Sequence, residues 1–264
     1  MKLGFIGCGN MASAIMSGII SNGLMDANEI IGADVFAPSK EKVKMTLGIQ
    51  IADSNIEVVQ KADAFVLSVK PQFYEAVIGE IKDYVKENQI IITLAPGKTL
   101  QWLEGQFGKP VKIVRTMPNT PAMVQEGMTA ACPNAYVTSE EVAYVCDILK
   151  AFGEVEVVPE KLIDAVVAVS GSSPAYVFML IEAMADAAVA EGMPRPQALK
   201  FAAKAVMGSA KMVLETGKHP GELKDMVCSP GGTTIEAVKV LEETGFRGSV
   251  MQAMEVCAEK SRSL

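Results

Sequence analysis

The sequence predicts an α/β domain built on a largely parallel sheet, followed by a domain made only of helices. Three observations support this prediction. Short apolar stretches alternate with helical stretches over residues 2–158, a glycine-rich turn joins the first strand to the first helix, and the pattern from Lys161 onward is helical. The chain has 264 residues, which suits two domains of ordinary size. We therefore expect one domain at residues 1–158 and a second at residues 159–264, with the boundary near Pro159.

Composition and charge exclude several classes of protein. The formal net charge of −7 argues against binding nucleic acid or an anionic membrane surface. The five cysteines are odd in number and lack C-x-x-C spacing, so they indicate reduced thiols in a cytoplasmic protein. We find no metal-binding motif, no signal peptide after Met1, and no apolar run long enough to span a membrane without charges. We therefore expect no metal, no nucleic acid and no membrane among its partners.

The first element is a short apolar strand over residues 2–6, which ends at Ile6. It runs into Gly7-Cys8-Gly9-Asn10-Met11-Ala12, a G-x-G-x-x-A turn, and then into a helix over residues 11–20. The glycines permit a tight turn and let a pyrophosphate approach the backbone at the start of the helix. Because this turn follows a strand and opens a helix, we predict that Ile6 and residues 7–12 bind a dinucleotide cofactor. A purely structural glycine turn is the alternative.

The second strand, expected over residues 29–33, ends at Asp34, which lies 22 residues after Ala12. A carboxylate at this place accepts hydrogen bonds from a ribose 2′-hydroxyl and repels a 2′-phosphate. Nearby Ser39, Lys40 and Lys42 could instead hold such a phosphate, or the lysines could belong to an ordinary solvated loop. The sequence therefore leaves both NADPH and NADH open as cofactors.

Three further apolar strands are expected over residues 64–69, 90–94 and 111–114, with a helix over residues 74–86 among the segments between them. Ligands in open α/β sheets bind beyond the carboxyl ends of the strands. The residues at those ends are Lys70, Pro71, Ala95, Pro96, Gly97, Met117, Pro118 and Asn119, and we expect them to line the cofactor. Asn55, after a short strand near residues 49–52, is either an adenosine contact or a helix N-cap. Strands over 127–132 and 154–158 and a helix over 139–152 would complete the sheet.

The C-terminal half predicts more apolar helix surface than one small domain can bury. A break at Ser170-Gly171-Ser172-Ser173-Pro174 precedes a helix over residues 175–191 that is apolar on almost every side, and a second helix spans residues 197–214. A helix that is apolar all round must be buried. We expect an interlocked dimer, and burial against the chain's own sheet domain is the alternative. His219, the only histidine, is interpreted as a turn residue.

The stretch Cys228-Ser229-Pro230-Gly231-Gly232-Thr233-Thr234-Ile235-Glu236 is a glycine turn that leads into a helix. Thr233 and Glu236 have the spacing of a capping box, which would make Thr234 the first helical residue and leave its hydroxyl free to face a ligand. Backbone N–H groups at such a helix start form a site suited to a carboxylate. A well-capped surface helix without a ligand is the alternative.

These segments resemble pyrroline-5-carboxylate reductase, and the resemblance covers essentially the whole chain. Its most specific part is Leu223-Lys224-Asp225-Met226-Val227-Cys228-Ser229-Pro230-Gly231-Gly232-Thr233-Thr234-Ile235. Three further segments add to it: Ser170 to Tyr176, Val69-Lys70-Pro71-Gln72, and Arg115-Thr116-Met117-Pro118-Asn119-Thr120-Pro121. The resemblance implies a Rossmann-like domain followed by a helical dimerisation domain like the C-terminal domain of 6-phosphogluconate dehydrogenase. It also implies interlocked dimers, which assemble into decamers in several members.

The family reaction is hydride transfer from NAD(P)H to the C=N bond of 1-pyrroline-5-carboxylate, which gives L-proline. By resemblance, the backbone near Gly232, Thr233 and Thr234 would hold the substrate carboxylate, and the Thr234 hydroxyl would bond the ring nitrogen as the catalytic contact. Ser229, Pro230, Gly231, Asn119 and Ser172 would also bind substrate, and Val69 and Gln72 would join Lys70, Pro71 and Met117 around the cofactor.

One departure from the family bears on the cofactor. Many relatives place a small polar or basic residue where Asp34 stands, and the family mostly prefers NADPH, so we expect substantial use of NADH here. Two rival functions are a β-hydroxyacid dehydrogenase and a non-catalytic dinucleotide sensor. The first needs a lysine in a G-x-x-x-K helix motif, but Gly171 is followed by Ser172-Ser173-Pro174-Ala175. The second would not need the intact segment from Pro230 to Thr234.

Overall fold

The computed structural model describes residues 2–94 and 96–263. The chain divides into two compact units: a sheet unit, which ends at Ser172 and also includes the chain from Cys257 onward, and a helical unit, Ser173–Val256. The sheet unit contains helices as far as Ser172, beyond the last strand, which ends at Val157. The domain boundary near Pro159 stays a prediction.

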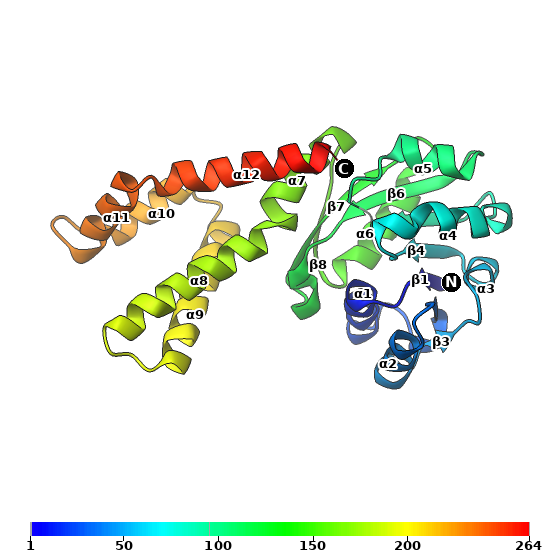
Figure 1. Ribbon diagram of the computed structural model, residues 1–264, viewed down its shortest axis with the longest axis horizontal. Helices are drawn as coiled ribbons and strands as arrows, with labels where there is room; N and C mark the ends of the chain where they lie inside the picture. The colour runs from blue at the N-terminus through cyan, green and yellow to red at the C-terminus, as the bar shows by residue number, and fades with distance from the viewer. Residues whose placement is uncertain (1, 95, 264) are drawn as a thin grey trace. The chain divides into compact units, whose positions relative to one another are not determined.

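The sheet unit follows the expected alternation of strands and helices (Figure 1). Its strands are β1 Leu3–Ile6, β2 Ile30–Ala33, β3 Gln50–Ile51, β4 Ala64–Leu67, β5 Ile90–Thr93, β6 Lys112–Met117, β7 Gly127–Pro133 and β8 Gly153–Val157. Its α-helices are α1 Asn10–Ser21, α2 Ala37–Leu47, α3 Asn55–Lys61, α4 Tyr74–Ile81, α5 Leu100–Phe107, α6 Ser139–Lys150 and α7 Ile163–Val166. Short 3₁₀ turns are η1 Ala27–Glu29, η2 Pro71–Phe73, η3 Lys82–Tyr84, η4 Thr120–Val124 and η5 Glu160–Leu162, and η6 Val167–Gly171 is a π-helix.

The strands form one sheet in the order β3-β2-β1-β4-β5-β6-β7-β8. Neighbouring strands run parallel except β6 and β7, which are antiparallel. The strand order reverses between β2-β1 and β4-β5, so the turn after β1 lies at the switch point where open α/β sheets bind ligands.

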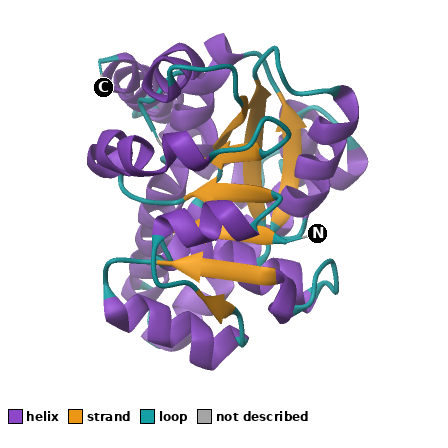
Figure 2. Ribbon diagram, turned by 90° about the vertical axis from the view of Figure 1, so that its right-hand side faces the viewer, coloured by secondary structure: helices purple, strands orange, loops and turns teal. Residues whose placement is uncertain are grey.

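Two apolar cores cover the two faces of the sheet, because each central strand sends alternate side chains to opposite sides. On one face, Leu3 and Phe5 of β1 pack in a cluster with Ile15 of α1 and Ile148 of α6. On the other face, Phe65 of β4 packs in a cluster with side chains of α3, α4 and α5. Figure 2 shows the strands in orange between purple helices. This burial on both faces explains why the central strands are apolar without alternation.

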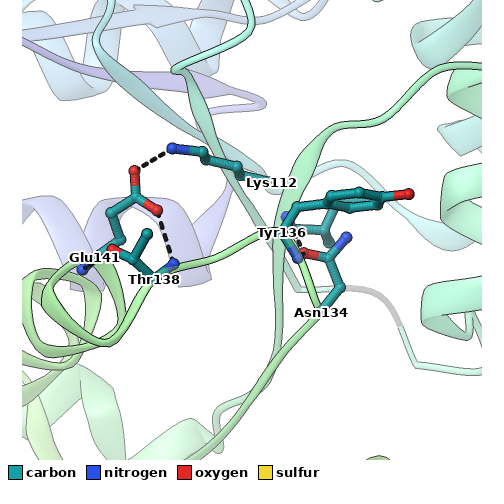
Figure 3. A network of polar contacts seen from close by, with 6 residues as sticks. Lys112, Asn134, Tyr136, Thr138 and Glu141 are labelled. Carbon is teal, nitrogen blue, oxygen red and sulfur yellow. Dashed lines mark hydrogen bonds and ion pairs between the residues drawn. The ribbon is translucent and has the colours of Figure 1, made fainter.

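The connection from β7 to α6 is fixed by a polar network (Figure 3). The Asn134 side-chain oxygen accepts hydrogen bonds from the backbone N–H groups of Ile113 and Tyr136 at 3.1 and 3.3 Å. Thr138 and Glu141 form a capping box at the start of α6, and Glu141 also pairs with Lys112 at 2.5 Å. The network ties β6 to the start of α6.

An ion pair between a buried arginine and a partly exposed glutamate links β6 to the first helical turn after the sheet. Arg115 donates to Glu160 Oε1 at 2.6 Å, and the same oxygen accepts the backbone N–H of Leu100 at 2.7 Å. The Arg115 side chain is 7% exposed and that of Glu160 is 31% exposed. One carboxylate thus joins three elements, namely β6, the start of α5 and η5.

The expected break at residues 170–174 is reduced to Ser172. The π-helix η6 continues to Gly171, Ser172 forms a bend, and α8 begins at Ser173 rather than at residue 175. A π-turn carries one extra residue, which offsets the helix register and frees carbonyl groups for other partners. Ser170 is such a residue: its carbonyl accepts a hydrogen bond from the Asn119 side chain at 3.0 Å.

The helical unit consists of α8 Ser173–Ala190, α9 Arg195–Thr216, α10 Pro220–Val227, α11 Thr233–Glu243 and most of α12 Phe246–Arg262. Within the part of this unit that the structure describes, the buried core consists of Ala185, Ala198 and Ala202, where α8 meets α9 (Figure 1). Large apolar side chains of this unit are more than half exposed, among them Phe178, Met179, Phe201, Leu214, Met226 and Met251. The unit by itself leaves much of its apolar surface uncovered.

Within the described residues, one helical stretch, Glu160–Ala190, is long and apolar enough to cross a membrane by length and composition alone. The sequence predicts no apolar run that could span a membrane without charges, and this stretch includes the charged residues Asp164 and Glu182. Only 17% of its most apolar window is buried inside the chain. Because core helices pass the same test, this stretch does not by itself indicate a membrane.

Candidate functional site

The turn after β1 forms an anion site at the start of α1. Gly7 has φ 97°, and a side chain there would place its Cβ 2.9 Å from the Ser68 carbonyl. Gly9 is the N-cap of α1 and has no atom within 4 Å of the place where a Cβ would lie. The helix has no side-chain cap and no acidic residue in its first turn. Its free N–H groups, at residues 10–12, therefore suit a pyrophosphate.

Asp34 closes this turn from the end of β2. Its Oδ2 accepts the backbone N–H of Cys8 at 2.7 Å, and its Oδ1 accepts the backbone N–H of Phe36 at 2.8 Å. Cys8 itself is buried, and burial, with a smaller effect from Asp34, raises the pKa of its thiol to about 12. Cys8 thus contributes its backbone to the site, and its thiol stays protonated.

A cavity of about 340 Å³ lies beside the turn. It is lined by Gly7, Asp34, Val35, Asn55, Val69, Phe73, Ala76, Val77 and Glu80. Four of these, Gly7, Asp34, Asn55 and Val69, were expected from the sequence to contact the cofactor, and the structure brings them together. A volume of this size, with apolar walls and a few polar groups, is typical of a small-ligand site.

The N-cap alternative for Asn55 is wrong. Ser54 is the N-cap of α3, because its hydroxyl accepts the N–H of Glu57. Asn55 is the first helical residue, and its side-chain nitrogen donates to Glu80 Oε2 at 2.8 Å. Asn55 therefore orients a second carboxylate of the cavity.

Two residues that hold this edge of the sheet were not expected. The Ser68 hydroxyl donates to the carbonyl oxygens of Ile6 and Gly7 at 3.0 and 2.7 Å. The Tyr74 side chain is fully buried, and its hydroxyl donates a hydrogen bond to the Leu67 carbonyl. Both hydrogen bonds join residues that the fold brings together, so no short sequence motif could have predicted them.

The remaining predicted cofactor residues lie at the carboxyl ends of β4, β5 and β6. Lys70 is the N-cap of η2, which contains Pro71 and Gln72. Pro96 and Gly97 lie in the loop after β5, where Gly97 has φ 74°, and Ala95 lies outside the described residues. Met117 ends β6 and is so close to Gly171 that a Cβ there would lie 2.9 Å from Met117 Cε.

Asn119 ties the end of β6 to the π-helix. Its side-chain nitrogen donates to the Ser170 carbonyl, and its oxygen accepts the N–H of Met128 at 2.9 Å. The neighbouring Ser172 hydroxyl accepts a hydrogen bond from the Cys257 thiol at 3.2 Å. Asn119 thus joins the π-helix to β7, and direct contact of Asn119 or Ser172 with substrate stays a prediction.

The expected capping box at Thr233 is wrong. Helix α11 begins at Thr233, and its N-cap is Gly232, which provides no side-chain hydrogen bond. Gly231 has φ 64°, a conformation that favours glycine, and a Cβ on Gly232 would lie 2.4 Å from Ser229 Oγ, so a side chain there would displace the serine hydroxyl. Thr233 and Thr234 are therefore the first two helical residues. The first three N–H groups of the helix, at residues 233–235, lack intrahelical partners and suit a carboxylate.

His219 behaves as the turn residue expected from the sequence. It is the N-cap of α10, and its Nδ1 accepts the N–H of Gly221 at 3.1 Å. Across residues 2–94 and 96–263, no group of three or more His, Cys, Asp and Glu side chains has an arrangement that could hold a metal ion.

Two family descriptions match the chain. Residues 160–264 match pyrroline-5-carboxylate reductase dimerisation, and residues 2–97 match NADP oxidoreductase, coenzyme F420-dependent. The pyrroline-5-carboxylate reductase of Escherichia coli is 56% identical over 100% of this chain and 98% of its own length. That of Arabidopsis thaliana is 41% identical over 100% of this chain and 95% of its own.

Solved structures agree with these sequence comparisons. A pyrroline-5-carboxylate reductase from Coxiella burnetii matches with a TM-score of 0.93 at 36% identity, covering 99% of this chain and 97% of that chain. The Plasmodium falciparum enzyme, solved with NADP bound, matches with a TM-score of 0.90 at 33% identity over 100% and 97%. The fold is thus a Rossmann-like domain followed by a helical dimerisation domain, as expected, and the cofactor is of the NAD(P) type. On this sequence, fold and site, the chain belongs to the pyrroline-5-carboxylate reductase family.

Proposed function

We propose that this chain reduces 1-pyrroline-5-carboxylate to L-proline with NAD(P)H, the last step of proline biosynthesis. The observation that carries the proposal is the start of α11. There a glycine turn leads into a helix whose first N–H groups have no side-chain cap, with Thr234 as its second residue. This arrangement offers a carboxylate site and a hydroxyl next to it, which are the two contacts that a cyclic imino acid needs.

The substrate is bound and oriented by the chain's own groups. The N–H groups of residues 233–235 hold the carboxylate, and the Thr234 hydroxyl bonds the ring nitrogen and so keeps the proton there. Ser229, Pro230, Gly231 and Gly232 shape the turn that presents these donors. A protonated cyclic imine is already electrophilic, so orientation supplies most of what the protein must add, and neither a histidine base nor a metal is required.

The cofactor is held by the sheet unit. The turn from Gly7 to Ala12 binds the pyrophosphate, and the cavity lined by Asp34, Asn55 and Val69 binds the adenosine half. Residues at the ends of the next strands, Lys70 to Gln72, Pro96, Gly97 and Met117, line the rest of its path. When bound, the reduced nicotinamide supplies the hydride.

The dimerisation domain makes this protein a homo-oligomer. We infer that the oligomer is built from interlocked dimers that assemble into decamers, and that its functional domains are residues 1–158 and 159–264. The exposed apolar side chains of α8 and α9 support the dimer, because contact with a second copy would cover them. All five cysteines are free, which supports a cytoplasmic location. A measured mass of ten chains would support the decamer, and a mass of two would contradict it.

The reaction is tested by initial-rate reduction of 1-pyrroline-5-carboxylate with NADPH and with NADH, together with identification of L-proline as the product. Turnover with either cofactor supports the proposal. Dinucleotide binding without turnover would favour a non-catalytic sensor, and turnover of a keto acid alone would favour a hydroxyacid dehydrogenase.

A further inference from the structure

We propose that the adenosine cavity selects NADH over NADPH through two carboxylates, Asp34 and Glu80, that face the same space. The inference rests on the proposed cofactor site and adds its specificity. It departs from the relative that was solved with NADP bound.

Asp34 is built to accept hydroxyl groups. Its two oxygens each accept one backbone N–H, from Cys8 at 2.7 Å and Phe36 at 2.8 Å, so the carboxylate plane is fixed. A carboxylate has about four acceptor positions, so one remains on each oxygen. A ribose 2′-hydroxyl can donate to such a position. A 2′-phosphate offers acceptor oxygens and negative charge instead, and the Asp34 carboxylate provides it with neither a donor nor an opposite charge.

Glu80 adds a second negative charge to the cavity. It projects from α4, lines the cavity, and is held by the Asn55 side chain at 2.8 Å. The nine described residues that line the cavity include these two carboxylates and no lysine or arginine. Two carboxylates without a cation raise the cost of bringing in the additional charge of about −1.5 to −2 that a 2′-phosphate carries.

The rival is a phosphate site on α2. Lys40 and Lys42 lie in the first turns of that helix, and Lys40 is near enough to Cys8 to affect it electrostatically. Neither lysine lines the cavity. The Ser39 backbone N–H is already bonded to the Phe36 carbonyl at 3.0 Å. The geometry therefore favours Asp34 as the residue that meets the ribose.

The test uses ligands that need no substrate and no turnover. Calorimetric titration of the full-length oligomer with ADP-ribose and with its 2′-phosphate isolates the adenosine half of the cofactor. Wild-type protein should bind ADP-ribose at least about tenfold more tightly, a ratio that corresponds to about 1.4 kcal/mol. Equal or tighter binding of the 2′-phosphate would overturn the proposal, and loss of that binding in Lys40→Gln would assign the phosphate to α2.

Two variants divide the effect between the carboxylates, and a third serves as the control. Asp34→Asn removes the charge with little change of shape and should lower the selectivity ratio about tenfold or more. Glu80→Gln keeps an acceptor for Asn55 and should lower it by roughly two- to fivefold. Glu75→Gln, an exposed position on the same helix outside the cavity, should leave the ratio unchanged. An unchanged ratio in both Asp34→Asn and Glu80→Gln would overturn the assignment.

Kinetics separate a failure of this inference from a failure of the proposed reaction. If 1-pyrroline-5-carboxylate is reduced and kcat/KM is higher with NADPH, the reaction stands and the selectivity is wrong. If ADP-ribose binds selectively and no imine is reduced, the selectivity stands and the reaction is wrong.

Discussion

Removing the carboxylate of Glu160 should destabilise the sheet unit by a measurable amount. Its Oε1 is the partner of the buried Arg115 guanidinium and of the Leu100 N–H, at 2.6 and 2.7 Å. Removing one partner of a fully buried ion pair lowers the free energy of unfolding by about 3–5 kcal/mol, whereas a fully exposed pair contributes only about 0.2–1 kcal/mol to it. Because Glu160 is 31% exposed and Arg115 only 7%, the expected cost lies between these limits.

We expect Glu160→Ala to lower the free energy of unfolding by about 2–3 kcal/mol. Glu160→Gln keeps an acceptor for the Leu100 N–H and loses only the charge, so about 1–1.5 kcal/mol is expected. Urea unfolding followed by the fluorescence of Trp102, the only tryptophan and a residue of α5, measures both variants. Protein concentration must be constant, because oligomerisation contributes to apparent stability.

The matched control is Glu154→Gln, an exposed carboxylate on β8, which should stay within about 0.5 kcal/mol of wild type. A loss below about 0.5 kcal/mol in Glu160→Ala would refute the reasoning. It would mean that solvent reaches Arg115 well enough to replace its partner.

Four further predictions concern the site, its surroundings and two buried thiols. Thr234→Ala should lower kcat roughly tenfold to several hundredfold, because it removes one transition-state hydrogen bond of about 1.5–3 kcal/mol. Thr233→Ala should leave the free energy of unfolding within about 0.5 kcal/mol of wild type, because the Thr233 side chain does not cap the helix. A loss near 1 kcal/mol would instead support a capping box at Thr233. Gly9→Ala should fold, at a cost of at most about 1 kcal/mol, because Gly9 is an N-cap with φ −71° and open space at its Cβ. It should bind ADP-ribose at least about tenfold more weakly in calorimetry, because the added methyl group lies where the pyrophosphate approaches the backbone. Burial raises the pKa of Cys8 from 9.0 to about 12 and of Cys132 to about 11, so the folded state keeps thiol protons that the unfolded state loses. Stability is therefore full below pH 9 and should fall above it, by at most about 1.4 kcal/mol per pH unit for each thiol, and a flat profile in urea unfolding between pH 8 and 10.5 would contradict this.

Capping boxes show where local sequence fails to fix local structure. Thr138 and Glu141 have the required spacing and form the box at the start of α6. Thr233 and Glu236 have the same spacing, yet α11 starts one residue earlier with Gly232 as its N-cap. The difference lies in what precedes the threonine. The left-handed Gly231 lets Gly232 adopt the extended N-cap conformation, with φ −82° and ψ 168°, so Thr233 is already helical.

The sheet was predictable because each central strand is buried on both faces, which imposes apolar runs such as that of β5. The π-helix at Val167–Gly171 was not predictable, because the local sequence of Ser and Gly residues followed by Pro174 favours a break in the helix. There the long-range bond from Asn119 to the Ser170 carbonyl outweighs local preference. Contacts of this kind join residues far apart in the chain and leave no short-range pattern.

The cofactor cavity was predicted in part. Asp34 and Val69 were expected from their places after strands, and both line it. Glu80 was not expected, because it lies in the interior of the amphipathic α4, where an exposed carboxylate is ordinary. Only the packing of α3 beside α4 brings Asn55 within hydrogen-bond distance of it.

The most direct test of the proposed function is the initial rate of 1-pyrroline-5-carboxylate reduction by the wild-type oligomer, measured in parallel with NADH and NADPH. We expect L-proline as the product and a higher kcat/KM with NADH. The absence of turnover with both cofactors, in protein that still binds ADP-ribose, would contradict the reductase function.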